Sequence, residues 1–152
     1  IAGSVKERYH TLEIGKLGGM LTQVPRLGWI LGLCSMASLG LPGLAGFWGE
    51  FPAILSAYNP DAGLNVTVYR TYMVIAAIGT VFAAAYLLWL YQRTAFGTPK
   101  GHDHHDLHDV NTHEWIAWLP LLVAIIAFGV APNLLFSVID PAVQGALRAF
   151  GG

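Results

Sequence analysis

Apolar residues in this chain gather in three long runs that are separated by polar segments. The first run covers residues 27–58 and contains a single charged residue, Glu50. The second covers residues 71–93, up to a flanking arginine, and the third covers about residues 115–139. Pro132 in the third run is expected to end or kink its helix. A helix rises about 1.5 Å per residue and the apolar core of a bilayer is about 30 Å thick. Runs of this length therefore predict three transmembrane helices.

The first run is too long for one straight helix. Its uncharged part, residues 27–49, already reaches about 34 Å as a helix, and the run continues beyond Glu50. Pro42 removes a backbone donor and clashes with the preceding turn, so we expect the first helix to be broken at Leu41–Gly46. The alternative is an unbroken helix, whose small residues in this segment only allow close packing against another helix. Four residues would shape the break: Gly40, Pro42, Gly43 and Gly46.

Polar segments occupy the rest of the chain. Residues 1–26 read as a loop with room for one short helix, residues 59–63 as a turn, and residues 94–114 as a His-rich loop. Residues 141–150 have apolar positions at helical spacing. They predict a short amphipathic helix at the membrane surface, or alternatively a frayed tail.

The distribution of Lys and Arg predicts the orientation. Six of the eight basic residues lie in the segments 1–26 and 93–114, and only Arg70 and Arg148 lie elsewhere. Three spans would place those two segments on one face of the membrane, and the positive-inside rule makes that face cytoplasmic.

Composition supports a multi-pass membrane protein. Hydrophobic residues make up 55% of the chain and charged residues 11%, and the mean hydropathy is +0.54. Average soluble domains are about 25% charged. The net charge of −1 gives no reason to expect nucleic acid as a partner. The single cysteine, Cys34, lies in an apolar run and is expected to act as a small hydrophobic side chain. Because the chain begins at Ile1 with a polar loop, we expect it to be an internal or C-terminal piece of a longer protein.

Glu50 is the strongest candidate for a functional residue. A carboxylate at membrane depth is costly, and acids within spans most often mark ion paths. The structural alternative is an acid that caps a helix or pairs with a neighbouring one. The position of Glu50 just after the predicted break favours the functional reading, because broken helices beside a lone acid occur in ion carriers.

The His-rich segment His102–Asp109 is a second candidate. His104 and His108 are four residues apart, and aspartates lie beside them, which is compatible with a metal site. Flanking Gly and Pro indicate a loose loop that fixes no geometry. We therefore expect a solvated loop and no built metal site.

A group of motifs resembles one family. The segment Ser38–Gly43, followed by Gly46-Phe47-Trp48-Gly49-Glu50-Phe51, looks like the M subunit of bacterial NADH:quinone oxidoreductase (respiratory complex I), called subunit 4 in mitochondria. Matching segments lie on both sides, so the resemblance covers nearly the whole chain in order. These segments are Glu7–Thr11, Leu17–Gly19, Ala84–Arg93 and Asn111–Trp115.

The resemblance implies both a fold and a function. It implies an all-α membrane protein, with residues 1–152 forming the last three transmembrane helices of a 14-helix antiporter-like subunit. Such subunits translocate protons while partner subunits pass electrons from NADH to quinone. The broken twelfth helix supplies the residue nearest the periplasmic exit, and Glu50 occupies that position. Sister subunits usually have Lys there. The His102–Asp109 loop departs from the family pattern.

The resemblance also implies the cofactors, the partners and the cellular location. No cofactor is expected in this chain, because NADH, FMN, the iron–sulfur clusters and quinone belong to partner subunits. The expected partners are the other membrane subunits of complex I, including neighbouring antiporter-like subunits, and the expected location is the bacterial inner membrane. One alternative is a subunit of a multisubunit cation/proton antiporter or of a membrane-bound hydrogenase. Another is a purely structural membrane subunit, against which the broken helix with its acid argues.

Overall fold

The computed structural model describes residues 1–100 and 107–149, which form helices and loops without a strand. The predicted all-α fold class is confirmed. The polar N-terminal segment contains more structure than the one short helix for which the sequence left room. In chain order the helices are α1 (Ala2–Tyr9), the 3-10 helix η1 (Ile14–Lys16), α2 (Met20–Gln23), α3 (Pro25–Ser38), α4 (Ala45–Ser56), α5 (Val66–Ala95), α6 (Thr112–Val130) and α7 (Asn133–Ala149).

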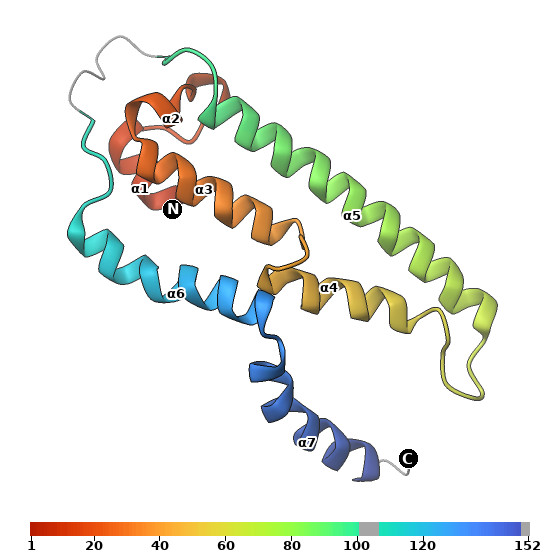
Figure 1. The fold of residues 1–152 in the computed structure, drawn as a ribbon. Helices are drawn as coiled ribbons and strands as arrows, with labels where there is room; N and C mark the ends of the chain where they lie inside the picture. The colour runs from red at the N-terminus through yellow and green to blue at the C-terminus, as the bar shows by residue number, and fades with distance from the viewer. Residues whose placement is uncertain (101–106, 150–152) are drawn as a thin grey trace.

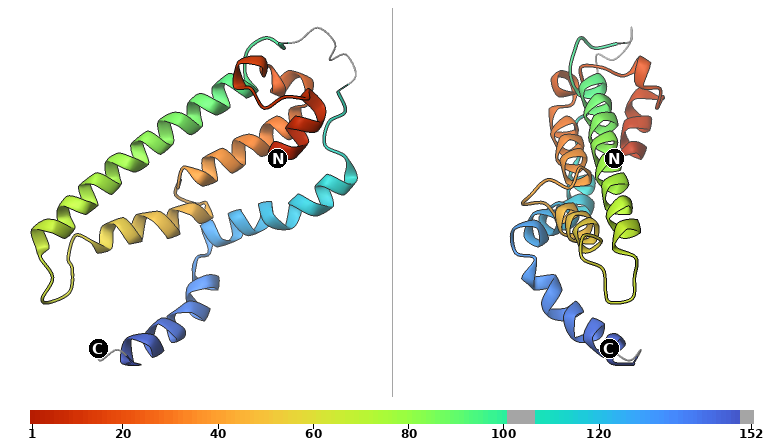
Figure 2. Two further views of the ribbon diagram at one scale, coloured as in Figure 1. Left: turned by 180° about the vertical axis from the view of Figure 1, so that it is seen from behind. Right: turned by 90° about the vertical axis from the view of Figure 1, so that its right-hand side faces the viewer.

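The long helix α5 organises the arrangement. Helices α3 and α4 follow one another along α5, and both pack against it (Figure 1). Helix α6 packs against α4, near the point where α3 gives way to α4. Helix α7 leaves the other helices at the end of α6, which both views in Figure 2 show.

The buried core lies at one end of the molecule. It forms where the N-terminal segment packs against the first turns of α3, the segment before α6, and α6 itself. Its most enclosed side chains are Met20, Val24 and Leu27. The core joins the N-terminal segment and the start of α3 to Val110 and Leu122, which lie about a hundred positions later in the chain. The buried apolar residues of this core are Val5, Tyr9, Leu17, Met20, Val24, Leu27, Ile30, Val110 and Leu122.

Two of the described helices, α5 and α6, are long and apolar enough to cross a membrane. The most apolar window of α5 has none of its residues buried within the chain. An apolar surface of this extent requires lipid or other protein to cover it. Helices α3 and α4 reach only about 21 Å and 18 Å, so neither could cross a bilayer alone.

The first apolar run forms two helices with an irregular link. Helix α3 ends at Ser38, and Gly40 takes the left-handed conformation (φ 67°) that commonly ends a helix. Gly43 also has a positive φ, of 92°. The link therefore covers residues 39–44, slightly before the predicted Leu41–Gly46. Gly46 differs from the prediction because it lies inside α4.

The third apolar run also differs from the predicted single span over residues 115–139. Helix α6 begins at Thr112 and ends at Val130, in line with the end or kink expected at Pro132: Ala131, which precedes this proline, leaves the helical conformation (φ −124°, ψ 67°). The chain then starts α7 in a new direction (Figures 1 and 2). Residues 133–139 thus belong to α7, which also contains residues 141–149, the segment predicted as amphipathic. The second run is helical over Val66–Ala95, longer than predicted.

Two glycines allow α3, α4 and α6 to approach closely at the link. A β-carbon on Gly46 would collide with the carbonyl oxygen of Ala37, at the end of α3. A β-carbon on Gly129 of α6 would collide with the carbonyl of Gly43 and the Cα of Leu44. The carbonyl oxygen of Gly129 also accepts a hydrogen bond from Trp48 Nε1, at 2.8 Å. Helix α6 is therefore held against the link by backbone contact.

This contact predicts a contrast between two glycines of α4. Gly46→Ala should lower the free energy of unfolding by about 1–3 kcal/mol, because the new methyl group must displace the backbone of Ala37. Gly49→Ala should leave it unchanged or slightly raised, because Ala favours helix and, apart from the neighbouring backbone of α4, no atom of the described residues lies within 4 Å of the added carbon. Thermal unfolding of the two purified variants in detergent measures the difference. Equal midpoints for both variants would contradict the close packing.

Candidate functional site

Glu50 lies on α4, one turn after Gly46. Residues four apart share a helix face, and this face of α4 meets the end of α3. The carboxylate turns back over the link, so that a β-carbon on Gly40 would lie only 3.0 Å from Glu50 Oε2. The acid and the left-handed glycine are therefore neighbours in space, although ten positions separate them.

The Glu50 side chain is exposed within this chain. Among the described residues it forms no hydrogen bond and no ion pair. If Glu50 is an acid with a structural role, the group that pairs with it therefore lies outside residues 1–100 and 107–149.

The structure brings the sequence-predicted residues together at the link. Gly40, Pro42 and Gly43 lie in it, Gly46 lies in the first turn of α4, and Glu50 lies in the next. The two helix ends that meet here carry opposite partial charges, negative at the end of α3 and positive at the start of α4. The link thus combines irregular backbone, helix termini and a carboxylate.

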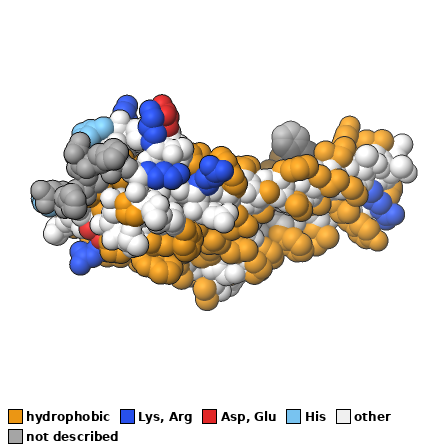
Figure 3. Space-filling model, turned by 90° about the horizontal axis from the view of Figure 1, so that it is seen from above, with side chains coloured by type: hydrophobic (Ala, Val, Ile, Leu, Met, Phe, Trp, Pro, Cys, Tyr) orange, Lys and Arg blue, Asp and Glu red, His pale blue; other side chains and the backbone are white. Residues whose placement is uncertain are grey.

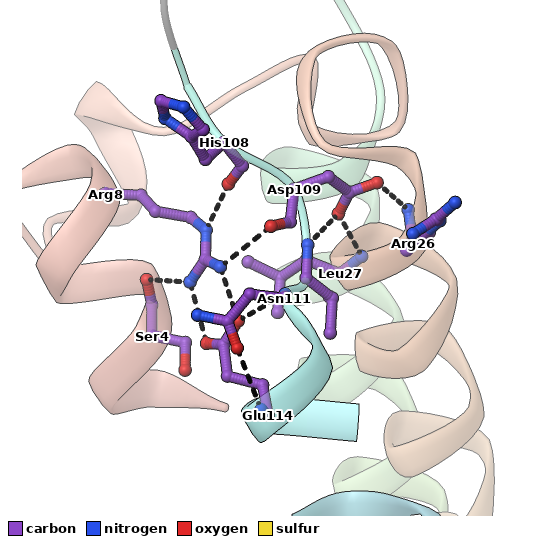
Figure 4. Close-up of polar contacts among 9 residues, drawn as sticks. Ser4, Arg8, Arg26, Leu27, His108, Asp109, Asn111 and Glu114 are labelled. Carbon is purple, nitrogen blue, oxygen red and sulfur yellow. Dashed lines mark hydrogen bonds and ion pairs between the residues drawn. The ribbon is translucent and has the colours of Figure 1, made fainter. Parts of the chain in front are cut away.

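A second polar cluster lies at the other end of α3, and sequence reasoning did not find it (Figure 4). Arg8 binds Glu114 through two hydrogen bonds, Nη2 to Oε2 at 2.6 Å and Nη1 to Oε1 at 2.9 Å. Arg8 also donates to the backbone carbonyls of Ser4, His108 and Asp109. The two charged side chains are only 9% and 16% exposed. The hydrogen bonds to Glu114 raise the pKa of the Arg8 guanidinium.

Asp109 caps α3 from a distant part of the chain. Its Oδ2 accepts the backbone N–H of Arg26 at 2.9 Å, and its Oδ1 accepts that of Leu27 at 3.1 Å. The first N–H groups of a helix have no hydrogen-bond acceptor within the helix. The side chain of Val24, which precedes Pro25 at the start of α3, is apolar and cannot accept a hydrogen bond from them. Asp109 therefore joins the start of α3 to the segment that enters α6.

Only part of this cluster had a signal in the sequence. Asn111 and Glu114 form a capping box, whose spacing identifies the start of α6: Asn111 Oδ1 accepts the Glu114 N–H at 2.9 Å and Glu114 Oε2 accepts the Asn111 N–H at 3.1 Å. Arg8 and Asp109 act over about a hundred positions, and no local pattern reveals such a pairing.

The His-rich segment is only partly described. His102, His104 and His105 lie outside the described residues, so the expectation of a solvated loop without a built metal site stays a prediction there. Within the described part of the chain, no group of three metal-binding side chains occurs. His108 and Asp109 instead contribute to the polar cluster around Arg8.

Comparison with known families decides the identification. Residues 1–79, which include the link and Glu50, match the family described as NADH:quinone oxidoreductase/Mrp antiporter, TM. The chain belongs to this family.

Relatives with curated names extend the match over the remaining residues. The chain is 35% identical over 150 residues to NADH-quinone oxidoreductase subunit M of Rickettsia conorii, which covers 99% of this chain and 29% of that protein. It is 34% identical over 148 residues to the protein of the same name from Rhodobacter capsulatus, covering 97% of this chain and 27% of that protein. The chain thus spans under a third of the length of these relatives.

A solved structure has the same fold. A chain of respiratory complex I from Thermus thermophilus with bound NADH superposes with a TM-score of 0.80 and 30% identity. The match covers 99% of this chain and 30% of that one. Family membership therefore rests on both sequence and three-dimensional arrangement.

The polar cluster yields a prediction about stability. Glu114→Gln should lower the free energy of unfolding by about 2 kcal/mol, because it weakens charge-assisted hydrogen bonds and leaves Arg8 without its counterion. Glu13→Gln is a matched control, since Glu13 pairs with Lys16 where both side chains are about two-thirds exposed. That change should cost less than about 1 kcal/mol. Chemical denaturation of both variants tests this prediction. Equal losses in the free energy of unfolding would contradict a stabilising role for the Arg8–Glu114 ion pair.

Proposed function

We propose that this chain forms the C-terminal part of a proton-translocating membrane subunit of NADH:quinone oxidoreductase. The observation that carries the proposal is the placement of Glu50 beside an irregular link, in a chain of this family. Translocation would be coupled to electron transfer from NADH to quinone in partner subunits. The chain itself would hold no redox centre, and NADH, FMN, iron–sulfur clusters and quinone would bind elsewhere in the complex.

The membrane arrangement follows from helix lengths. Helices α3 and α4 together would cross the bilayer as one interrupted span, while α5 and α6 would each cross alone. Support comes from Figure 1, where α3 and α4 in succession run beside α5, which is about 45 Å long. The interrupted backbone would lie within the membrane, covered by protein.

The orientation follows from charge. The starts of α3 and α6 and the end of α5 lie at one end of the molecule, and most basic residues lie there too (Figures 1 and 3). This end, with loops 1–26 and 93–114, would face the cytoplasm of a bacterial cell. The neighbours in the membrane would be other subunits of the complex, including antiporter-like ones.

Glu50 would bind and release protons on the path across the membrane. Three features support this role: a carboxylate on a helix that we propose to lie in the membrane, its place over the helix link, and the lack of a fixed cation among the described residues. Gly40, Pro42, Gly43 and Gly46 would shape the path by holding the link open to the side chain, without carrying protons themselves.

A second candidate is a subunit of a cation/proton antiporter, because the family description also names the Mrp antiporter. A membrane-bound hydrogenase subunit would share this architecture. The candidates differ in what drives the transport. Proton uptake that depends on NADH and quinone favours the oxidoreductase, and uptake driven by a sodium gradient alone favours the antiporter.

The central prediction concerns substitutions of Glu50. Glu50→Gln keeps the size and hydrogen-bonding capacity of the side chain but cannot release a proton, so the complex should assemble while proton translocation falls. Proton transfer by a positioned side chain contributes about 10²–10⁴-fold, so a fall of about a hundredfold is expected. Glu50→Asp should retain part of the activity, and Glu50→Ala should be at least as damaging as Glu50→Gln.

Membrane vesicles that carry each variant of the complete subunit provide the test, with quinone reduction and proton uptake measured together. Glu13→Gln, an exposed acid in the N-terminal segment, is the control and should match the wild type. Normal assembly of Glu50→Gln with wild-type proton uptake would make Glu50 a structural acid.

The His-rich loop should be dispensable for translocation. Replacing His102, His104, His105 and His108 together with Ala should leave proton uptake unchanged, because the loop is a polar connection outside the membrane. His108 contributes its backbone carbonyl to Arg8, and that group survives the substitution. Loss of uptake, or of a metal bound in stoichiometric amount, would refute this expectation.

A further inference from the structure

A pocket opens at the C-terminal end of α5, away from Glu50. Its volume is about 510 Å³. It lies where the apolar length of α5 gives way to the polar connection that follows. The residues that line it are Trp89, Gln92, Arg93, Phe96, Gly97, Thr98 and Lys100.

Two cations line this pocket, and no acid does. The guanidinium of Arg93 lies over the ring of Trp89, with 4.9 Å between its central carbon and the ring centroid. Lys100 Nζ donates to the carbonyl of Gly15 at 3.3 Å, which leaves two further N–H groups for a ligand. Both cations therefore have defined positions, and their combined charge is uncompensated within the lining.

The other walls are apolar or neutral and polar. Trp89 is 49% exposed and Phe96 is 53% exposed, so large aromatic surfaces border the pocket. Gln92 and Thr98 add neutral groups that can donate hydrogen bonds. An occupant should therefore be anionic at one end and apolar at the other.

The location limits the occupant further. Figure 3 shows Lys and Arg side chains gathered at one end of the molecule, with apolar side chains along its length. Trp at the end of a membrane span sits at headgroup level, and basic pockets beside spans on the cytoplasmic side attract acidic headgroups. The acyl chains of such a lipid could follow the exposed side chains of α5, such as Tyr86 and Leu88.

We propose that this pocket binds the phosphate headgroup of an anionic phospholipid. Arg93 and Lys100 bind the phosphate oxygens, Gln92 and Thr98 donate to the headgroup, and Trp89 and Phe96 contact the first carbons of the lipid tails. This proposal rests on the membrane arrangement and orientation proposed above for α5. It does not depend on the role of Glu50.

Photo-crosslinking in proteoliposomes tests the site. The complete membrane complex is reconstituted with a low fraction of phosphatidylglycerol that carries a photoactivatable group, and labelling of residues 89–100 is measured by mass spectrometry. Each basic residue near a membrane surface strengthens anionic-lipid binding about fivefold, so Arg93→Gln with Lys100→Gln should reduce labelling about 25-fold. Phosphatidylcholine with the same group should label the segment weakly in every case.

Arg70→Gln is the matched control. Arg70 also lies on α5 and also stacks on an aromatic ring, with 4.5 Å to the centroid of Tyr58, but it lies at the opposite end of the helix. Its loss should leave labelling of residues 89–100 unchanged. Arg93→Lys with Lys100→Arg keeps both charges and should retain most of the labelling, which separates charge from misfolding.

Three outcomes would overturn the proposal. Labelling that is equal in the wild type and the double Gln variant would show that the pocket is covered by protein or binds no lipid. Equal labelling by phosphatidylcholine would remove the requirement for an anion. Labelling at background level in the wild type, together with binding of inorganic phosphate that the double Gln variant loses, would identify a site for free phosphate instead of a lipid.

Discussion

The structure depends on one contact, which is the close approach of backbone to backbone where α6 meets the link between α3 and α4. Peptide groups in a membrane cost several kcal/mol when they lack a hydrogen-bond partner. Here the end of α3 and the start of α4 meet at a link in which two glycines take positive φ values. Gly46 and Gly129 then let backbone approach backbone, and Trp48 supplies a donor to Gly129. The link is thus a packed junction of three helices.

The two ends of α3 are fixed by different chemistry. At its start, Asp109 accepts two backbone N–H groups, and Arg8 binds Glu114 to join the N-terminal segment to α6. At its end, contact between backbones replaces charged pairs. Helix α6 takes part at both places, since its first turn carries Glu114 and its last turn carries Gly129. A change in the position of α6 would therefore reach both the polar cluster and the link beside Glu50.

The sequence predicted the parts of the fold that depend on local composition. Long apolar runs predicted the helices, Pro42 with its glycines predicted the interruption, and the acid after it identified the candidate site. Local signals were less exact about the bounds of the break: the link covers residues 39–44, and Gly46 lies within α4, where it packs closely on Ala37. Pro132 was expected to end or kink the third helix, and α6 does end just before it, at Val130. The span was nevertheless drawn to residue 139, because the apolar pattern continues past Pro132.

The polar cluster lay beyond sequence reasoning for a related reason. Arg8 and Glu114 are separated by 106 positions, and each looked like an ordinary loop residue. Glu50 was found because a charge in an apolar run is conspicuous, whereas a charge in a polar loop is not. The family resemblance contained both segments of the cluster but gave no reason to place them in contact.

We propose that the Glu50 carboxyl group changes protonation while the complex works. Infrared difference spectroscopy on the intact complex, comparing resting and turning-over states, measures this directly through the C=O stretch of a protonated carboxyl group. A carboxyl band is expected that appears or disappears on turnover and is absent in Glu50→Gln. A difference spectrum that is identical in the wild type and a fully assembled Glu50→Gln complex would contradict it.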